Sequence, residues 1–219
     1  MEQLTGKPLT WRWAEWLLLF IAVPVALRIW WQPLVLLALL VLTTIWGIWW
    51  LKQQRLPHYQ PLWRGPAGRN ERRQLKRLLW RFALSTGLLI ATVWIFIPAK
   101  LFDMPRTQPK LWLLILAFYP LFSVYPQEII YRALFFARYR PLFRGAYATL
   151  LASAGAFGFM HLVFQNWPAV LLTLIGGWLF AETYARTYSL RLVWLEHSLY
   201  GALIFTVGLG DYFYHGNVG

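Results

Sequence analysis

Residues 111–139 read LWLLILAFYPLFSVYPQEIIYRALFFARY. No charged residue occurs in the first half of this stretch, which is typical of a helix that crosses a membrane. The stretch then continues through Pro126 into Glu128 and Arg132. An ionisable residue at bilayer depth costs at least about 2.5 kcal/mol on insertion scales, so each one suggests a functional site. We therefore expect one long span, kinked near Pro126, that carries part of a site.

The composition of the whole chain also indicates a membrane protein. Of its 219 residues, 59% are hydrophobic, 19% are aromatic and only 13% are charged, whereas a soluble domain is about one quarter charged. The sequence contains no cysteine, which excludes disulfides, thiolate metal sites and cysteine nucleophiles. The net charge of +13 would suggest nucleic acid as a partner of a soluble protein, but here we predict no nucleic acid, because the position of the charges matters more than their sum.

Apolar stretches predict an all-α, polytopic bundle of about seven transmembrane helices. Their approximate ranges are 16–31, 34–51, 82–97, 111–139, 146–163, 170–185 and 192–210. After Val25 the chain continues as Arg28 and another apolar run, so we expect no cleaved signal peptide. We divide the chain into residues 1–110, with a hairpin, a basic loop and a third span, and residues 111–219, with the catalytic core.

The basic loop covers residues 52–81 and predicts the orientation. Its only acid is Glu71, and we expect it to lie in the cytoplasm beside anionic lipid headgroups. The N-terminus is then cytoplasmic and the C-terminus lies outside. Within the loop, Asn70 to Trp80 is expected to form a separate amphipathic surface helix.

Polar groups within the apolar spans form the candidate site. Glu128 and Arg132 are one helical turn apart and can pair on one face. His161 and His197 lie on two further spans. From the helical rise, Glu128 lies roughly 18 Å, His161 roughly 25 Å and His197 roughly 9 Å above the cytoplasmic edge. Tilt and kinks can bring these heights together, so the arithmetic permits convergence without requiring it.

A carboxylate and two imidazoles in a small wet pocket suggest hydrolysis. Glu128 would serve as the base, while one imidazole holds the water and the other donates to the oxyanion. Zinc is an alternative, because two His and one Glu match a catalytic zinc ligand count. Nothing in the sequence resembles the helical HExxH arrangement, so we favour a site without metal or cofactor.

Three segments in order resemble the motifs of one family. They are QEIIYR at 127–132, FGFMH at 157–161 and HSLYG at 197–201. They are similar to the EExxxR, FxxxH and HxxxN/D motifs of the CPBP family, the CAAX prenyl protease and bacteriocin-processing intramembrane proteases. The resemblance covers roughly residues 111–210 and implies a glutamic-type intramembrane protease. Its mechanism implies catalytic roles for Glu128, His161 and His197, with Arg132 and Phe157 in support.

Two positions depart from that family pattern. Gln127 stands where the first glutamate is usual, and Gln cannot be a general base. Gly201 stands where Asn or Asp usually completes the oxyanion site. In an active protein Glu128 must therefore be the base, unless Glu182 or Glu196 turns inward. Gln127 would orient water or bind substrate backbone, and Gln127 or a backbone group would replace the missing oxyanion donor.

Three functions remain open from the sequence. The first is an intramembrane endopeptidase acting on a membrane-associated or membrane-delivered protein, in a bacterial inner membrane. The second is an inactive relative that acts as a scaffold, chaperone or immunity protein. The third is a small transporter or proton relay, although the chain lacks the internal repeat of inverted-repeat transporters. Convergence of Glu128, His161 and His197 on a water-sized polar cavity favours hydrolysis, whereas a dry Glu128–Arg132 pair with both imidazoles pointing elsewhere favours the scaffold.

Overall fold

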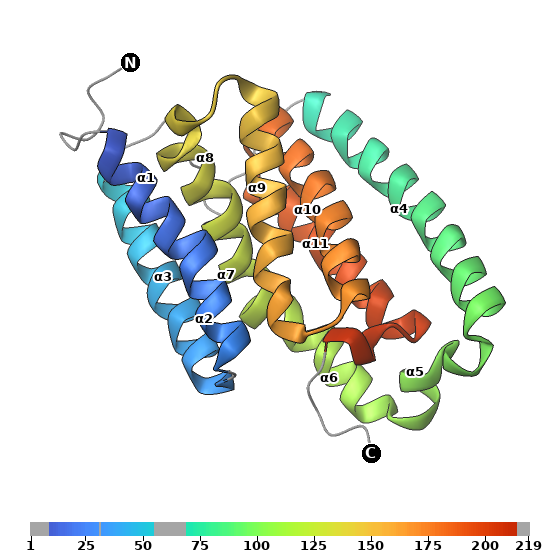
Figure 1. Cartoon of the computed structure of the whole chain (residues 1–219). Coiled ribbons are helices and arrows are strands. Elements are labelled where there is room, and N and C mark those ends of the chain that lie inside the picture. Colours follow the sequence, from blue (N-terminus) through green and yellow to red (C-terminus); the bar gives the residue numbers. More distant parts are fainter. Residues whose placement is uncertain (1–8, 31, 55–68, 214–219) are drawn as a thin grey trace.

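The computed structural model describes residues 9–30, 32–54 and 69–213, and these residues fold as a bundle of helices (Figure 1). The all-α class predicted from the sequence is confirmed. The termini of the chain and the middle of the predicted basic loop, residues 55–68, lie outside the described residues.

The first two predicted spans form a helical hairpin. Its first arm runs through α1 (Leu9–Leu17), the π-helical η1 (Leu18–Ala22) and α2 (Val23–Ile29). Its second arm is α3 (Pro33–Gln53), which begins at a proline, a residue whose fixed φ suits the first turn of a helix. Phe20 and Leu51 are fully buried where this hairpin packs against the rest of the bundle.

The third arm is a single helix, α4 (Arg69–Phe96). The expectation of a separate surface helix over Asn70–Trp80 is therefore wrong, because the helix continues without interruption into the apolar span. Residues 69–96 contain no proline, and their one glycine, Gly87, lies well inside the apolar span, so nothing ends the helix at Trp80. In Figure 1, α4 stands at one edge of the bundle, on the side away from α1–α3.

The long apolar stretch over residues 111–139 is part of one helical rod. After η2 (Pro98–Lys100) and α5 (Asp103–Thr107), the rod has five consecutive segments. They are α6 (Pro109–Tyr119), η3 (Pro120–Val124), α7 (Tyr125–Glu128), η4 (Ile129–Leu134) and α8 (Phe135–Arg138). The segments η3 and η4 are π-helical, and short π-helical turns inside longer helices occur often at functional sites. Pro126 thus lies between two π turns in a rod that does not break.

Three further helices complete the core. After η5 (Arg140–Leu142), these are α9 (Ala146–Met160), continued by the short η6 (His161–Phe164), α10 (Trp167–Thr187) and α11 (Leu190–Val207). The side chain of Asn166 accepts from the Ala169 amide at the start of α10, and Ser189 accepts from Leu192 at the start of α11. These caps satisfy amides that lack a partner within the helix.

Helices α9 and α10 pack closely, and small residues allow this approach. A Cβ at Gly177 would lie 3.1 Å from both the Ala154 carbonyl oxygen and the ring of Phe157. A larger residue at 177 would separate the two helices. Since Phe157 also belongs to the candidate site, the approach of these helices positions that site.

The C-terminal segment η7 (Gly210–Phe213) is tied to the loop before α5. Lys100 forms an ion pair with Asp211, and this hydrogen bond raises the pKa of Lys100 despite some loss of hydration. Gly208 ends α11 with a φ of 98°, a conformation suited to glycine, and passes close to the Lys100 carbonyl.

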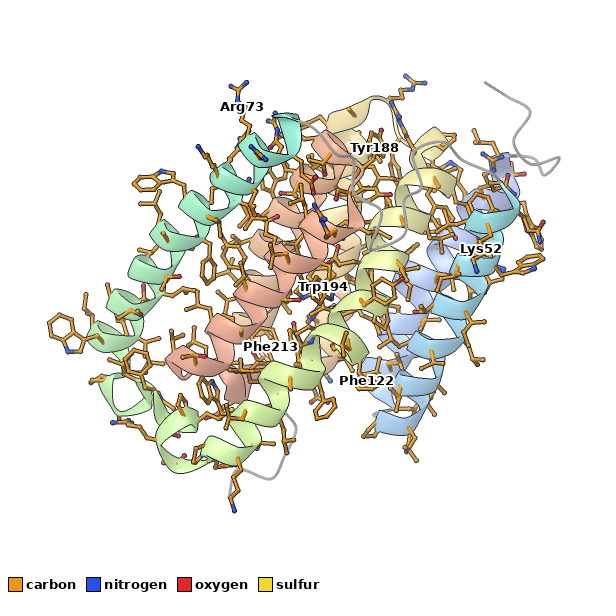
Figure 2. The ribbon with its side chains drawn as sticks, turned by 180° about the vertical axis from the view of Figure 1, so that it is seen from behind. Lys52, Arg73, Phe122, Tyr188, Trp194 and Phe213 are labelled. Carbon is orange, nitrogen blue, oxygen red and sulfur yellow. The ribbon has the colours of Figure 1, made fainter. Side chains whose placement is uncertain are left out.

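Five described helices are long and apolar enough to cross a membrane. They cover Pro33–Gln53, Glu71–Phe96, Pro109–Arg138, Gly145–Phe164 and Trp167–Thr187. The predicted first and seventh spans are helical too but are not among these five, so the count of seven is not confirmed. Figure 2 shows Lys52 and Arg73 toward one end of the bundle and Phe122 and Phe213 toward the other.

Candidate functional site

Glu128 is the centre of the predicted site and is completely buried. It is the last residue of α7. Its Oε1 atom lies 2.7 Å from Nδ1 of His197, and its Oε2 atom lies 3.3 Å from Nε of Arg132. A carboxylate only accepts hydrogen bonds, so an ionised Glu128 requires that Nδ1 of His197 carries a proton.

Arg132 is also completely buried, and it joins three helices. Its Nη1 atom donates to the Tyr131 carbonyl and to Ser153, and its Nη2 atom lies 3.4 Å from the carbonyl oxygen of Gly177. The guanidinium also lies 5.0 Å from the ring centroid of Phe157, within the range of cation–π attraction. The sequence prediction of a Glu128–Arg132 pair is therefore confirmed in its geometry, with additional partners on α9 and α10.

His197 connects the buried pair to the rest of the site. It lies on α11 with its ring stacked on Phe180 at a centroid separation of 4.5 Å. Its second nitrogen, Nε2, lies 3.1 Å from the hydroxyl of Tyr119 on α6. A chain of hydrogen bonds thus runs from Glu128 through His197 to Tyr119.

His161 lies where α9 changes to η6, close to but not in this chain. Its Nδ1 atom lies 2.7 Å from the Phe157 carbonyl oxygen, which can only accept, so Nδ1 carries the proton. In a neutral imidazole Nε2 is then an acceptor. The His161 ring packs against Phe157 at 4.7 Å, and Phe157 in turn contacts His197 at 5.4 Å. One aromatic side chain thus lies between the two imidazoles.

The side-chain amide of Gln127 has one atom that is hydrogen-bonded and one that has no partner among the described residues. Its Nε2 atom donates to Ser123 at 2.8 Å, one turn earlier. Its Oε1 atom is buried and has no hydrogen-bond partner among the described residues. A buried carbonyl oxygen without a partner costs free energy, so this atom is suited to accept from a bound water or a substrate amide.

A cavity of about 320 Å³ opens beside these groups. Most of its wall is apolar and comes from α4, α9, α10 and α11. Its polar lining consists of Ser85, Tyr119, Ser123, Gln127, His161, Thr173, His197 and Tyr200. An apolar cavity with a few convergent polar groups is the usual form of a ligand site.

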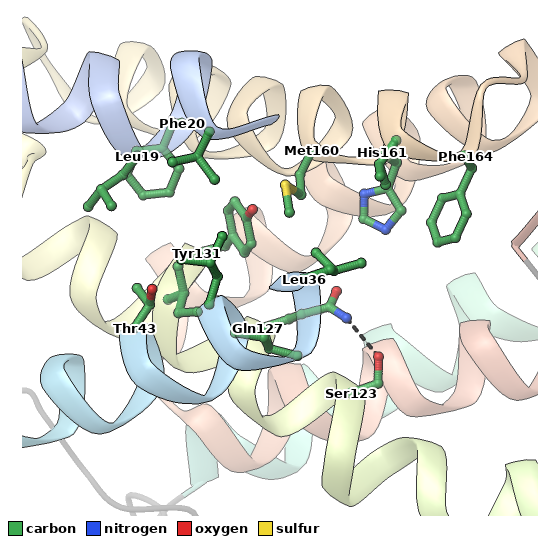
Figure 3. A pocket seen from close by; sticks show the side chains of 15 residues that line it. Leu19, Phe20, Leu36, Thr43, Ser123, Gln127, Tyr131, Met160, His161 and Phe164 are labelled. Carbon is green, nitrogen blue, oxygen red and sulfur yellow. Dashed lines mark hydrogen bonds between the residues drawn. The ribbon is translucent and has the colours of Figure 1, made fainter. Parts of the chain in front are cut away.

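A second, smaller cavity of about 190 Å³ meets the first one at the polar groups. It lies between the N-terminal hairpin and the rod, lined by residues such as Leu19, Leu36 and Met160. Figure 3 shows Gln127 and His161 projecting into it from opposite walls. Ser123, Gln127, His161 and Phe164 line both cavities. The polar groups therefore lie at the junction of two apolar spaces.

The structure brings the predicted residues together, but it gives Glu128 an indirect position. His161, His197, Gln127, Phe157 and Gly201 line the larger cavity, whereas Glu128 and Arg132 line neither of these two cavities.

The two alternative carboxylates are engaged elsewhere. Glu182 pairs with Arg77, Arg81 and Arg186, and Glu196 pairs with Arg81 at 2.7 Å. Arg81 thus joins α4 to both α10 and α11. The Glu182 side chain is partly exposed, whereas Glu196 is completely buried; neither lines one of these cavities. They do not replace the glutamate missing at position 127.

Sequence reasoning missed two functional candidates. Tyr119 precedes Pro120 in an apolar run, and nothing in its surroundings distinguishes it from other interfacial tyrosines. Arg81 could have been recognised as the last basic residue before an apolar span, although its partners on α10 and α11 could not.

The arrangement of the possible metal-ligating side chains can be compared with what a zinc site requires, since zinc is the alternative to a site without metal. Within the described ranges no three His, Asp or Glu side chains are placed to share a metal ion. One nitrogen of each imidazole is already bonded, that of His161 to a carbonyl and that of His197 to Glu128.

These features define an integral, multi-pass membrane protein with a candidate site inside the helical bundle. Residues 109–203 match the family model described as Type II CAAX prenyl endopeptidase Rce1-like. This match confirms the resemblance to the CPBP family over the part of the chain that holds the rod, α9, α10 and most of α11. No curated protein and no solved structure gave a significant match. The description of the family names an endopeptidase, which is a protease.

Proposed function

We propose that the protein is an intramembrane endopeptidase that hydrolyses a peptide bond of a membrane-associated or membrane-delivered protein. One observation carries this proposal. Imidazoles from two different helices line one cavity, and one of them is bonded to a buried carboxylate at 2.7 Å. The family match to residues 109–203 supports protease chemistry.

The water is activated by His161 and Gln127. Nδ1 of His161 carries a proton and donates it in a hydrogen bond to the Phe157 carbonyl. In the neutral imidazole Nε2 is therefore unprotonated and can accept a proton from water. The unpaired Oε1 atom of Gln127 accepts a hydrogen bond from the other water proton and orients the molecule. The water oxygen then bonds to the substrate carbonyl carbon, and the carbonyl oxygen becomes an oxyanion.

Collapse of this intermediate completes the reaction. His161 returns the proton to the substrate nitrogen, the C–N bond breaks, and a carboxylic acid and an amine leave. Glu128 acts through His197, because the carboxylate does not line either cavity. It holds the Nδ1 proton and stabilises the positive charge that His197 carries as an imidazolium near the oxyanion. In this role Glu128 is a positioning residue, and His161 takes the role of base that was predicted for Glu128 from the sequence.

The test compares membrane-proteome N- and C-termini by mass spectrometry in cells that carry the native protein, Glu128→Ala or His161→Ala at matched protein levels. A specific new terminus should appear only with the native protein. That terminus also identifies the substrate and the cleavage site. Identical termini in all three samples, together with a phenotype for the native protein, would overturn the proposal.

We further propose that the site works without a resident metal ion. The support is the donor set, since one nitrogen of each imidazole and the Oε1 atom of Glu128 are hydrogen-bonded to protein groups, and the Oε2 atom lies 3.3 Å from the positively charged Arg132. Cleavage in isolated membranes should therefore stay within about twofold of its starting rate after dialysis against EDTA or 1,10-phenanthroline. A loss that added Zn²⁺ restores would contradict this.

A second candidate function has one observation in its favour. Glu128 and Arg132 form a completely buried pair that lines neither cavity, which is one part of the arrangement expected of an inactive relative. The other part, imidazoles that point elsewhere, is not met, because His197 contacts Glu128. A scaffold, chaperone or immunity protein would keep its phenotype in His161→Ala, because this substitution leaves the Glu128–Arg132 pair intact.

We also propose a bacterial inner membrane with the N-terminal end of the bundle in the cytoplasm. Arg77, Arg81, Arg186 and Arg191 lie together at one end through their ion pairs with Glu182 and Glu71, which fits the positive-inside rule. Anionic lipid headgroups at the basic segment 52–81 remain a prediction, since residues 55–68 are outside the described ranges.

A further inference from the structure

Gly201 leaves a space that another side chain fills. His197 and Gly201 lie one turn apart on the same face of α11. A Cβ added at Gly201 would lie 2.6 Å from the hydroxyl oxygen of Tyr119 and 2.7 Å from its Cζ atom, closer than real Cβ atoms approach other atoms. The phenol of Tyr119 therefore occupies the position where a side chain at 201 would begin.

The hydroxyl of Tyr119 is held there by specific contacts. It lies 3.1 Å from Nε2 of His197, and the ring packs edge-on against Phe205 at 5.7 Å. Tyr119, His197 and Gly201 all line the larger cavity. A phenol has a single proton, so the direction of this bond depends on Nε2 of His197. An unprotonated Nε2 accepts from the hydroxyl, whereas a protonated Nε2 donates to the phenol oxygen and leaves the hydroxyl proton for a ligand in the cavity.

We propose that Tyr119 and His197 form the oxyanion-binding pair of this site, and that Tyr119 replaces the donor that a side chain at 201 would supply. This inference rests on the proposed hydrolytic function. In this proposal His197 is an imidazolium throughout the reaction and transfers no proton: its Nδ1–H donates to the ionised Glu128 and its Nε2–H donates to the Tyr119 oxygen. The Tyr119 proton then points to the substrate oxygen as the negative charge develops.

The geometry explains why the tyrosine and a residue at 201 exclude each other. Both would project into the same volume beside Nε2 of His197. Gly201 is therefore required by Tyr119, and the departure from the family motif at this position is compensated by a residue from a different helix.

The first test is Tyr119→Phe, which removes the hydroxyl and keeps the ring. Cleavage, measured as the rate at which the native-dependent terminus appears, should fall about 10²–10³-fold, as for other lost oxyanion donors. Tyr147→Phe is the matched control, because Tyr147 is exposed on α9 and outside the site. Native-like cleavage by Tyr119→Phe would overturn the inference.

A pair of variants tests the shared volume. Gly201→Asn alone should abolish cleavage and lower the unfolding temperature, because its side chain collides with Tyr119. Tyr119→Ala combined with Gly201→Asn should cleave at least about tenfold faster than Tyr119→Ala alone, because the amide can then donate in place of the phenol. A double variant no faster than Tyr119→Ala would count against the exchange.

A spectroscopic readout separates this inference from the proposed function. In ¹⁵N-histidine-labelled protein in detergent, Tyr119→Phe should shift the imidazole nitrogen signals that disappear in His197→Gln, and Tyr147→Phe should leave them in place. Shifted signals without cleavage by any variant, the native protein included, would overturn hydrolysis but leave the Tyr119–His197 bond. Unchanged signals would overturn the inference even if the native protein cleaves.

Discussion

Replacing His161 with alanine should lower the cleavage rate about 10²–10⁴-fold, the usual contribution of a general base. The His161 imidazole lines both cavities where they meet. Its ring orientation is set by the hydrogen bond from Nδ1 to the Phe157 carbonyl. The variant should remain folded, because the hydrogen bond that is lost joins the ring to its own helix. The measurement is the rate at which the native-dependent terminus forms in membranes with equal amounts of protein.

Two further variants sharpen the His161 experiment. His161→Gln keeps a polar group of similar reach but no basic nitrogen, so it should be as slow as His161→Ala. Trp167→Phe is the control, because Trp167 lies six residues after His161 and its side chain is 79% exposed. This variant should cleave at the native rate. His161→Gln at the native rate would exclude His161 as the base.

Replacing Glu128 with alanine should have the largest effect on stability, a loss of about 3–5 kcal/mol of unfolding free energy. Arg132 is completely buried, and removal of its partner leaves an uncompensated charge in the core. The variant should also be inactive, because Nδ1 of His197 loses its acceptor. Chemical unfolding in detergent micelles, followed by tryptophan fluorescence, provides the measurement.

A double substitution separates the two roles of Glu128. Glu128→Met with Arg132→Met removes both charges, so it should recover much of the lost stability, yet remain inactive. Asp211→Ala is the comparison for an exposed ion pair, that with Lys100, and should cost less than about 1 kcal/mol. A double variant as unstable as Glu128→Ala would show that the buried charge is not the cause.

The helical class of the protein and the residues that converge on the site could be predicted from the sequence. Three short motifs on three spans predicted that Glu128, His161 and His197 belong to one site, and the structure brings them together. The heights calculated from the helical rise differ by more than about 10 Å because they assume straight, regular helices with known starting points. The π-helical turns and the change from α9 to η6 at His161 violate that assumption.

Other features depend on contacts between distant segments. Helical spacing does not determine whether the Glu128 carboxylate points into the cavity or toward His197. Its position behind His197 therefore could not be predicted. Tyr119 has no motif of its own, since its role depends on the space left by Gly201 on another helix. Likewise, α4 continues where a surface helix was expected, because charge alone does not end a helix.

The π-helical turn η4 lets the rod direct polar side chains toward different neighbours on either side of the turn. A π turn holds one residue more than an α turn, and one extra residue rotates the rest of the rod by about 100° around the helix axis. Before and within the turn, Glu128 and Arg132 face α9–α11, whereas Arg138, after it, binds Glu15 of α1 at 2.5 Å. Removing one residue from 129–134 would change the phase of one face relative to the other. Length in this segment is therefore as constrained as residue identity.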